Sequence, residues 1–208
     1  MNVRLYHFGR SSSSWRVRIV LALKGVPYES VIVDFGVGEQ KGDAFRGVNP
    51  LGQVPCLEVD GERISQSVAI AELLEERAPE PRLVPVREPE RARVRRVVET
   101  INSGIQPLHN SGLDASFRKA FDASDEAILG WKRFWLERRL RALETTLASY
   151  AGTFSVADAI SLADVFLYPQ IERARAHGVA IEELPTVARL EQTLREQPGF
   201  EETSPERV

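Results

Sequence analysis

Short apolar runs and one helical pattern organise the first third of the chain. Residues 3–8 and 28–33 are apolar runs of strand length, and each predicts a short strand. Between them, residues 19–25 carry a helical pattern that ends in a glycine, which is typical of a helix C-terminus. A strand, a helix and a second strand with a short return imply a right-handed parallel crossover, so this part predicts a βαβ unit.

A hairpin and a helix follow. Residues 56–64 contain two apolar runs that flank Asp60-Gly61, a strong signal for a two-residue hairpin turn. Residues 68–77 then repeat apolar side chains at helical spacing, and Ser67 is the expected N-cap. The second group of elements is therefore ββα.

Glycine and proline mark the segment between these two groups. Residues 36–47 are polar and glycine-rich, with one short predicted helix around residues 43–45. Residues 49–55 contain two prolines and one glycine, which predicts a tight and rigid turn.

A proline-rich linker divides the chain into two parts. Pro79, Pro81 and Pro85 place this linker at about residues 78–85, and no strand pattern is found beyond it. We therefore expect an α/β domain over residues 1–80 and an all-helical domain over residues 86–208.

Helical patterns fill the second part. Residues 89–110 predict a long helix whose last turn is kinked or frayed by Pro107. A polar loop around residues 112–116 separates it from a second helix over residues 125–150, whose apolar stripe indicates the core of a helix bundle.

The last helices have clear start signals. Ser161 followed three residues later by Asp164 resembles a capping box at the start of a third helix. A final helix follows Pro185, and residues from 198 onward are expected to form a loose tail.

Composition excludes several classes of protein. The net charge is −3, which gives no reason to expect a nucleic-acid partner, and no apolar stretch approaches the roughly 18 residues that span a membrane. The single cysteine, Cys56, excludes an intramolecular disulfide and favours a reducing compartment, so we expect a cytoplasmic protein. His7, His109 and His177 show no metal-ligand spacing, and no metal site is predicted.

The segment Arg10–Arg18 carries the most distinctive chemistry. Four serines, Ser11 to Ser14, lie where a predicted strand turns into a helix. Serine hydroxyls at this place cap free N–H groups, and the positive end of the helix dipole stabilises an anion such as a thiolate. One interpretation is that the serines only cap the helix. The other is that they form a binding site for an anion.

Several motifs together resemble the zeta class of the glutathione transferases. Residues 11–19 are similar to that class's Ser-Ser-Cys-Ser-Trp-Arg-Val-Arg-Ile signature, except that Ser13 replaces the cysteine. Residues 49–55 and 66–70 resemble the class as well, and so do residues 104–110, in which His109 replaces the usual glutamine. The likeness extends to residues 161–164 and 168–170, and so covers nearly the whole chain.

The resemblance implies a fold and a cosubstrate. It implies an N-terminal thioredoxin-like βαβ-ββα domain joined to a C-terminal helical bundle, with glutathione as cosubstrate. By motif position Ser11 is the partner of the glutathione sulfur, with Ser12 and Ser13 beside it as further catalytic candidates. The backbone of Val54, before a cis Pro55, is implied to pair with glutathione. Further glutathione ligands are implied at Gln66, Ser67, Gln40, Gln106 and Asn110.

The substrate class follows from the same resemblance. The class is known for isomerases of maleylacetoacetate and maleylpyruvate in the breakdown of aromatic compounds, which act by reversible addition of a thiolate to a double bond. Such a dicarboxylic substrate calls for arginines, and the candidates are Arg10, Arg16 and Arg175. The family's arginine on the third helix of the helical domain corresponds to Ala176 here. The class also forms homodimers, and we expect the helix from Pro89 and the apolar face of residues 68–74 to provide the surfaces.

Two other functions remain open at this point. The chain is alternatively a general glutathione transferase that conjugates or dehalogenates small electrophiles. It is also compatible with a non-catalytic binding protein on the same fold, since fold alone does not imply function. Within the serine turn, Ser14 is expected to lie nearest the cap position and to act on stability.

Overall fold

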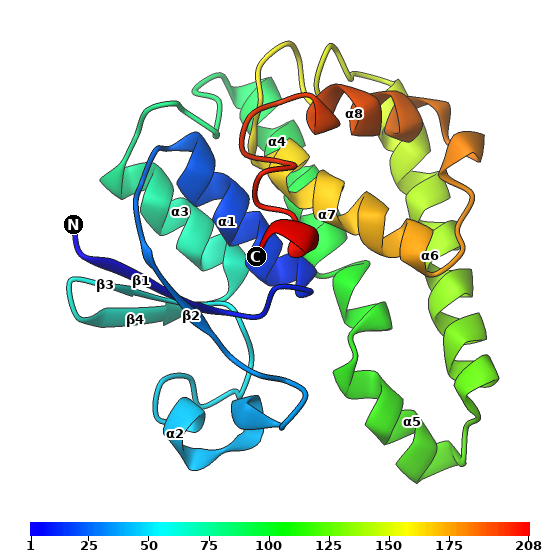
Figure 1. Ribbon diagram of the computed structural model, residues 1–208. Coiled ribbons are helices and arrows are strands. Elements are labelled where there is room, and N and C mark those ends of the chain that lie inside the picture. The colour runs from blue at the N-terminus through cyan, green and yellow to red at the C-terminus, as the bar shows by residue number, and fades with distance from the viewer. The chain divides into compact units, whose positions relative to one another are not determined.

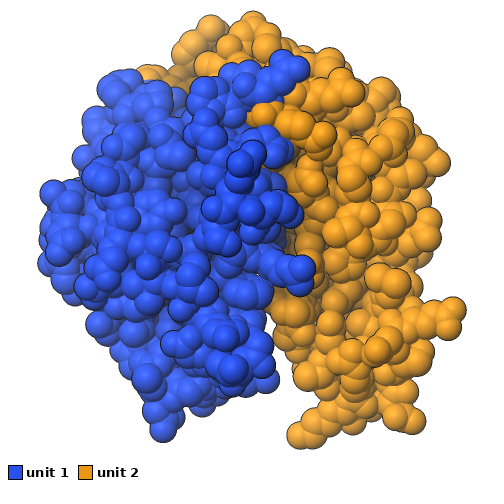
Figure 2. Space-filling model, in the orientation of Figure 1, with its two compact units in different colours: residues 1–83, 196–208 blue, residues 84–195 orange.

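The structure is a computed structural model that describes all 208 residues and contains two compact units. The N-terminal unit consists of residues 1–83 together with residues 196–208, and the helical unit consists of residues 84–195 (Figure 2).

A four-stranded mixed sheet forms the base of the N-terminal unit, with strand order β2-β1-β3-β4. Strand β1 (Val3–His7) runs parallel to β2 (Glu29–Ile32) and antiparallel to β3 (Cys56–Val59), which forms a hairpin with β4 (Glu62–Ser65). Alternate residues of β1 are buried, as expected for a strand with one face on the core. The predicted βαβ-ββα order is confirmed.

Two long helices of this unit pack against each other (Figure 1). Helix α1 (Ser12–Leu23) and helix α3 (Ser67–Arg77) bury their apolar faces, while the short helix α2 (Asp43–Arg46) and the 3-10 turn η1 (Glu39–Lys41) fill the connection to β3. Cys56 is buried in β3, and burial raises the pKa of its thiol, which agrees with a structural role for this residue.

The helical unit is arranged around helix α7 (Leu162–Ala176), which is buried over most of its length. It packs against α4 (Glu88–Asn102), α6 (Asp125–Ala148) and α8 (Pro185–Arg195). The remaining elements are α5 (Gly112–Phe121) and the 3-10 turns η2 (Gln106–His109), η3 (Ile181–Glu183) and, in the N-terminal unit, η4 (Pro205–Arg207).

The predicted capping box at the start of α7 is confirmed. The Asp164 carboxylate accepts hydrogen bonds from the backbone N–H of Ser161 at 2.9 Å and from that of Ser155 at 2.8 Å. This carboxylate is fully buried, and burial raises its pKa. No helix of the structure combines the length and the apolar character that crossing a membrane requires.

Two predictions about the helical unit were wrong. The helix predicted over residues 89–110 ends at Asn102, because the chain turns at Gly104, where an added Cβ would lie 2.6 Å from the carbonyl oxygen of Thr100. Pro107 accordingly lies in η2 rather than in the last turn of a long helix. Residues 112–116, predicted as a loop, begin helix α5.

The prediction of a loose C-terminal tail was also wrong. Phe200 is fully buried, and the indole N–H of Trp15 donates to its carbonyl oxygen at 3.2 Å. These contacts explain why residues 196–208, which the sequence assigns to the helical domain, belong to the N-terminal compact unit.

Candidate functional site

Ser11 begins helix α1 as its N-cap. Its backbone is extended, with φ −78° and ψ 116°, and its hydroxyl accepts the N–H of Ser14 at 3.2 Å. The cap is therefore Ser11, and the expectation that Ser14 lies nearest the cap position was wrong. The physical reason is that the chain becomes helical at Ser12, so Ser14 is already a buried residue of the first turn.

This capping geometry leaves the serine turn chemically competent. The hydroxyl of Ser11 uses a lone pair for the cap, so its O–H group can still donate a hydrogen bond to another acceptor. Ser11, Ser12 and Ser13 are all partly exposed, and first-turn N–H groups have no acceptor within their own helix. The turn thus offers hydroxyl and amide donors, together with the helix dipole, to an anion.

A rigid turn before β3 presents a backbone edge in the same unit. The Asn49 side chain donates to the carbonyl oxygen of Gln53 at 2.6 Å and accepts the N–H of Leu51 at 3.2 Å. The peptide bond between Val54 and Pro55 is cis, as the family resemblance implies. Sequence reasoning did not single out Asn49, although its place in an Asn-Pro-x-Gly turn is a usable signal.

Gln40 lies against this turn. Gly52 has a φ of +62°, and a Cβ there would lie 2.7 Å from the backbone oxygen of Gln40, so glycine permits the close approach. The side-chain oxygen of Gln40 is buried and has no hydrogen-bond partner in the protein. A buried acceptor of this kind suits a ligand that brings N–H groups, such as a peptide.

Gln66 and Ser67 start helix α3. Gln66 occupies the N-cap position with φ 76° and ψ 117°, a rare conformation for a residue other than glycine. Ser67 is the first helical residue, so its expected role as N-cap was wrong. Strained backbone of this kind costs on the order of 1–3 kcal/mol and is concentrated at ligand sites.

The three candidate arginines have very different surroundings. Arg10 is exposed directly before Ser11. Arg16 is fully buried, its guanidinium reaches the Ser67 hydroxyl at 3.4 Å, and burial lowers its pKa to about 9. Arg175, in the helical unit, forms ion pairs with Glu182 and Glu191. Of the three, Arg10 is the one with an exposed side chain and no ion pair.

The candidate residues of the helical unit surround η2. Gln106 is its first residue, and Asn110, its C-cap, is exposed and accepts the N–H of Gly112 at 3.2 Å. His109 between them is buried, with its Nε2 atom 3.1 Å from the amide nitrogen of Gln170. The structure also brings His109 and His177 together, with ring centroids 6.0 Å apart, a proximity that their sequence separation conceals.

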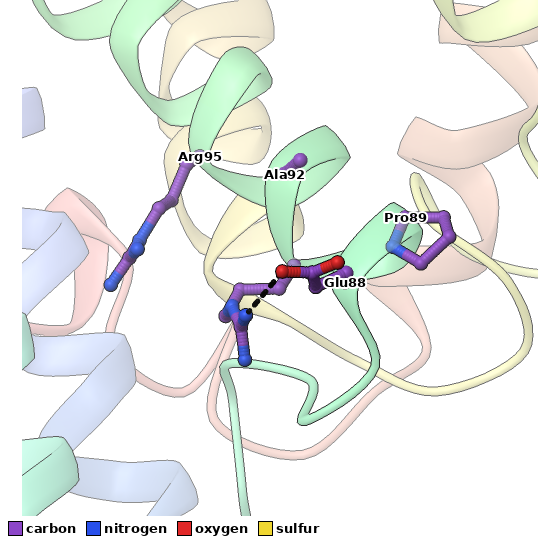
Figure 3. Close-up of a pocket in the computed structure, with 5 residues that line it drawn as sticks. Glu88, Pro89, Ala92 and Arg95 are labelled. Carbon is purple, nitrogen blue, oxygen red and sulfur yellow. Dashed lines mark ion pairs between the residues drawn. The ribbon is translucent and has the colours of Figure 1, made fainter.

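A separate pocket lies on the exposed side of α4 and holds none of the predicted site residues (Figure 3). It is lined by Glu88, Pro89, Arg91, Ala92 and Arg95. Arg91 is held by the carbonyl oxygen of Val86 at 2.8 Å and by the carboxylate of Glu88 at 3.8 Å.

Comparison with known proteins gives one consistent family. Residues 10–77 match the family model of the glutathione S-transferase N-terminal domain. The maleylacetoacetate isomerase of Rattus norvegicus is 40% identical over 203 residues, which cover 97% of this chain and 91% of that protein.

Solved structures agree over nearly the full length. The holo structure of a maleyl pyruvate isomerase, described as a bacterial glutathione S-transferase of the zeta class, has a TM-score of 0.95 at 37% identity and covers 99% of this chain and 98% of its own. The maleylacetoacetate isomerase of Anaeromyxobacter dehalogenans 2CP-1, with dicarboxyethyl glutathione and citrate bound in its active site, has a TM-score of 0.88 at 41% identity, covering 100% and 96%.

Proposed function

Because the chain belongs to the maleylacetoacetate isomerase family, the zeta class of the glutathione transferases, we propose that it is a glutathione-dependent cis–trans isomerase. Its substrate is an unsaturated dicarboxylic acid of the maleylacetoacetate or maleylpyruvate type, formed in the breakdown of aromatic compounds. The single observation that carries the proposal is the geometry of Ser11, whose cap leaves the hydroxyl proton available to a sulfur atom.

The serine turn would generate the nucleophile. A free thiol has a pKa of about 8.5 and is mostly protonated at neutral pH. The hydroxyl of Ser11 and the N-terminal end of α1 both favour the thiolate, and at about 1 kcal/mol each they would lower the thiol pKa by more than one unit. Ser12 and Ser13 add donors of the same turn.

Glutathione itself would be held by main-chain and polar groups. The backbone of Val54, beside the cis Pro55, presents its N–H and C=O to the cysteinyl part of glutathione in the manner of an added strand. Gln66 and Ser67, at the start of α3, suit the γ-glutamyl carboxylate. Gln40 supplies its unpaired amide oxygen, and Gln106 and Asn110 of the helical unit are further candidate ligands.

The isomerisation involves no net oxidation or reduction. The thiolate adds to one carbon of the cis double bond, and the electron pair moves to the conjugated carbonyl oxygen as an enolate. Rotation about the new single bond and return of the electron pair expel the thiolate and leave the trans isomer. Arg10 is the proposed ligand of a substrate carboxylate, whereas the buried Arg16 would act through Ser67.

One observation favours the second candidate, a general glutathione transferase. Arg175 is engaged with two glutamates, and its neighbour Ala176 cannot bind a carboxylate. This leaves the helical unit without an available arginine at the family position, which favours smaller or less acidic electrophiles as substrates. A non-catalytic protein would not need the free hydroxyl proton of Ser11.

One glutathione-dependent assay separates these candidates. Maleylacetoacetate, maleylpyruvate and a small haloacid would be compared at equal concentrations, with and without millimolar glutathione. We expect isomerisation of one of the two cis acids and little reaction of the haloacid. Faster release of halide than isomerisation would support the general transferase. Absence of any shift in melting temperature with glutathione would exclude both enzymes.

We also propose a homodimer, supported by the charges of two helices. The apolar residues Ile70 and Leu74 of the expected dimer face are buried within the N-terminal unit, so they are not the surface. Instead α3 exposes Glu76, and α4 exposes Ala92 and Arg93. The acidic helix of one protomer and the basic helix of its partner are complementary.

We place the protein in the cytoplasm, as a proposal of the same kind. Its cosubstrate must be the reduced thiol, and its single cysteine is buried as a free thiol. Both features suit a reducing compartment.

A further inference from the structure

Arg18 is an arginine of the signature motif to which the proposed function gives no role. It lies on α1 and is fully buried, yet its three hydrogen bonds all go to neutral acceptors. Burial lowers its pKa to about 10, so the guanidinium remains charged at neutral pH. Burying a charged guanidinium without a carboxylate partner costs free energy of folding. This cost indicates that the places to which Arg18 donates its three hydrogen bonds are important.

The first bond of Arg18 holds the turn that leads to the serines. Its Nη2 atom donates to the carbonyl oxygen of Gly9 at 3.0 Å. The same turn is closed by the N–H of Ser11, which donates to the carbonyl oxygen of Phe8 at 3.0 Å. Arg18 therefore fixes the backbone two residues before Ser11, from inside the unit.

The second bond ties this turn to the sheet. The Nη1 atom of Arg18 lies 3.3 Å from Nδ1 of His7, the last residue of β1. Because the guanidinium can only donate, Nδ1 accepts, and the opposite Nε2–H donates to the hydroxyl of Ser30 at 2.8 Å. Burial and the charge of Arg18 lower the pKa of His7 to about 4, which keeps this imidazole neutral.

The third bond adds the C-terminal segment, residues 199–204. The Nε atom of Arg18 donates to the carbonyl oxygen of Thr203 at 2.9 Å. One helical turn earlier, the indole N–H of Trp15 donates to the Thr203 hydroxyl at 3.1 Å. Gly199 permits the approach, because a Cβ there would lie 3.3 Å from the Ala22 Cβ atom. Figure 1 shows this segment beside α1.

We propose that Arg18 is a positioning residue of the serine turn, and that the C-terminal segment belongs to the same scaffold. The planar guanidinium directs three donors at Gly9, His7 and Thr203 at once and so sets the place of the Ser11 hydroxyl. A lysine would keep the charge but cannot direct three donors in this fixed plane. The inference rests on the proposed function, because the turn matters for catalysis only if it binds the glutathione sulfur.

The test compares Arg18→Lys with Arg63→Lys, a surface arginine of the same unit that pairs with Glu58. The ultraviolet absorbance of the bound thiolate gives the thiol pKa, and steady-state kinetics give kcat and KM. For Arg18→Lys we expect the thiol pKa to rise by about one unit and kcat to fall about tenfold, with KM for glutathione changed less than about threefold. Arg63→Lys should change neither.

Thr203→Val provides a milder variant if Arg18→Lys does not fold. It removes the hydroxyl that receives the Trp15 indole N–H and keeps the size of the side chain. We expect a smaller rise in thiol pKa in the same direction. A folded Arg18→Lys or Thr203→Val protein that loses melting temperature but keeps the wild-type thiol pKa would overturn the proposal.

A readout without glutathione separates this proposal from the proposed function. If wild-type protein shows no bound thiolate, the proposed function fails. The positioning role of Arg18 can then still be tested by amide hydrogen exchange of Ser14, whose N–H donates to the Ser11 hydroxyl. Faster exchange of this amide in Arg18→Lys than in Arg63→Lys supports the positioning role, and equal exchange contradicts it.

Discussion

Two serines of one turn have opposite hydrogen-bonding situations. The Ser11 hydroxyl accepts the N–H of Ser14, whereas the Ser14 hydroxyl is buried and has no hydrogen-bond partner. A buried hydroxyl without a partner contributes little or destabilises, while an N-cap stabilises its helix. The motif alone does not separate these serines, because which of four adjacent serines caps depends on where the backbone becomes helical.

The two serines should therefore differ in their effect on stability. We expect Ser11→Ala to lower the free energy of unfolding by about 1 kcal/mol, through loss of the cap. Ser14→Ala should leave it unchanged or raise it slightly, because it removes an unsatisfied hydroxyl. Urea unfolding of both variants measures this difference, and a larger loss in Ser14→Ala would show that the cap assignment is wrong.

The elements that sequence predicts well are those whose apolar residues face a core. The strands β1 and β3 and the helices α6 and α8 have buried apolar residues at the spacing of their element. Helix α5 was missed because Gly112 and Ser116 were interpreted as loop residues, although Leu113, Phe117 and Phe121 recur at helical spacing. None of its residues is buried. The end of α4 depends on the close approach of Gly104 to Thr100, which no periodicity reveals.

The same limit applies to the candidate site. Ser11, Val54 and Gln66 were predicted from local motifs, and the structure places each of them at a turn or at a helix start. The engagement of Arg175 and the link from Arg18 to Thr203 depend on residues far apart in the chain. A single sequence does not contain that information.

Substitution of Gly52 tests whether glutathione binding depends on the close approach of the rigid turn to Gln40. Gly52→Ala adds a methyl group 2.7 Å from the backbone oxygen of Gln40, so the two segments must separate. We expect glutathione affinity to fall about tenfold, a loss of roughly 1.4 kcal/mol. Gly61→Ala is the matched control, because Gly61 also has a positive φ but its Cβ would meet nothing within 4 Å. Calorimetry that finds equal affinities for both variants would refute this coupling.

The neutral side chain of His7, the last residue of β1, makes the free energy of unfolding depend on pH. Its pKa of about 4 in the folded chain is below the ordinary value of 6.5, so the unfolded chain binds the extra proton between these values. Stability should therefore fall as the pH falls, by about 2 kcal/mol between pH 7 and pH 5 from this group. Urea unfolding at both pH values should show a smaller loss for His7→Gln than for wild type, and identical losses would contradict the assignment.

At the scale of the whole molecule, the compact units do not follow the order of the chain. Residues 196–208 lie after the helical unit in sequence but belong to the N-terminal unit, where Trp15 and Arg18 hold them. A division of the chain at its proline-rich linker does not include this return. Residues 1–83 and residues 196–208 are thus held together by hydrogen bonds from Trp15 and Arg18, although the two segments lie far apart in the sequence.

Assembly can be tested through α4. Ala92 is exposed in the pocket beside Arg95, and Ala92→Glu adds a negative charge to a surface proposed to face an acidic helix. We expect wild-type protein to scatter light as a dimer of 23.3 kDa chains and Ala92→Glu to shift toward monomer. Ala142→Glu, on an exposed position of α6, is the control. A wild-type monomer at micromolar concentration would contradict the proposed dimer.

The role of Ser11 is tested by the thiol pKa of glutathione bound to wild type, Ser11→Ala and Ser12→Ala. Ultraviolet absorbance of the thiolate is followed across pH in each protein. We expect a wild-type thiol pKa more than one unit below the free value of about 8.5 and a higher thiol pKa in Ser11→Ala. In that variant we also expect a 10- to 1000-fold loss of turnover, about 1.4–4 kcal/mol. An unchanged pKa in Ser11→Ala with a raised pKa in Ser12→Ala would contradict it.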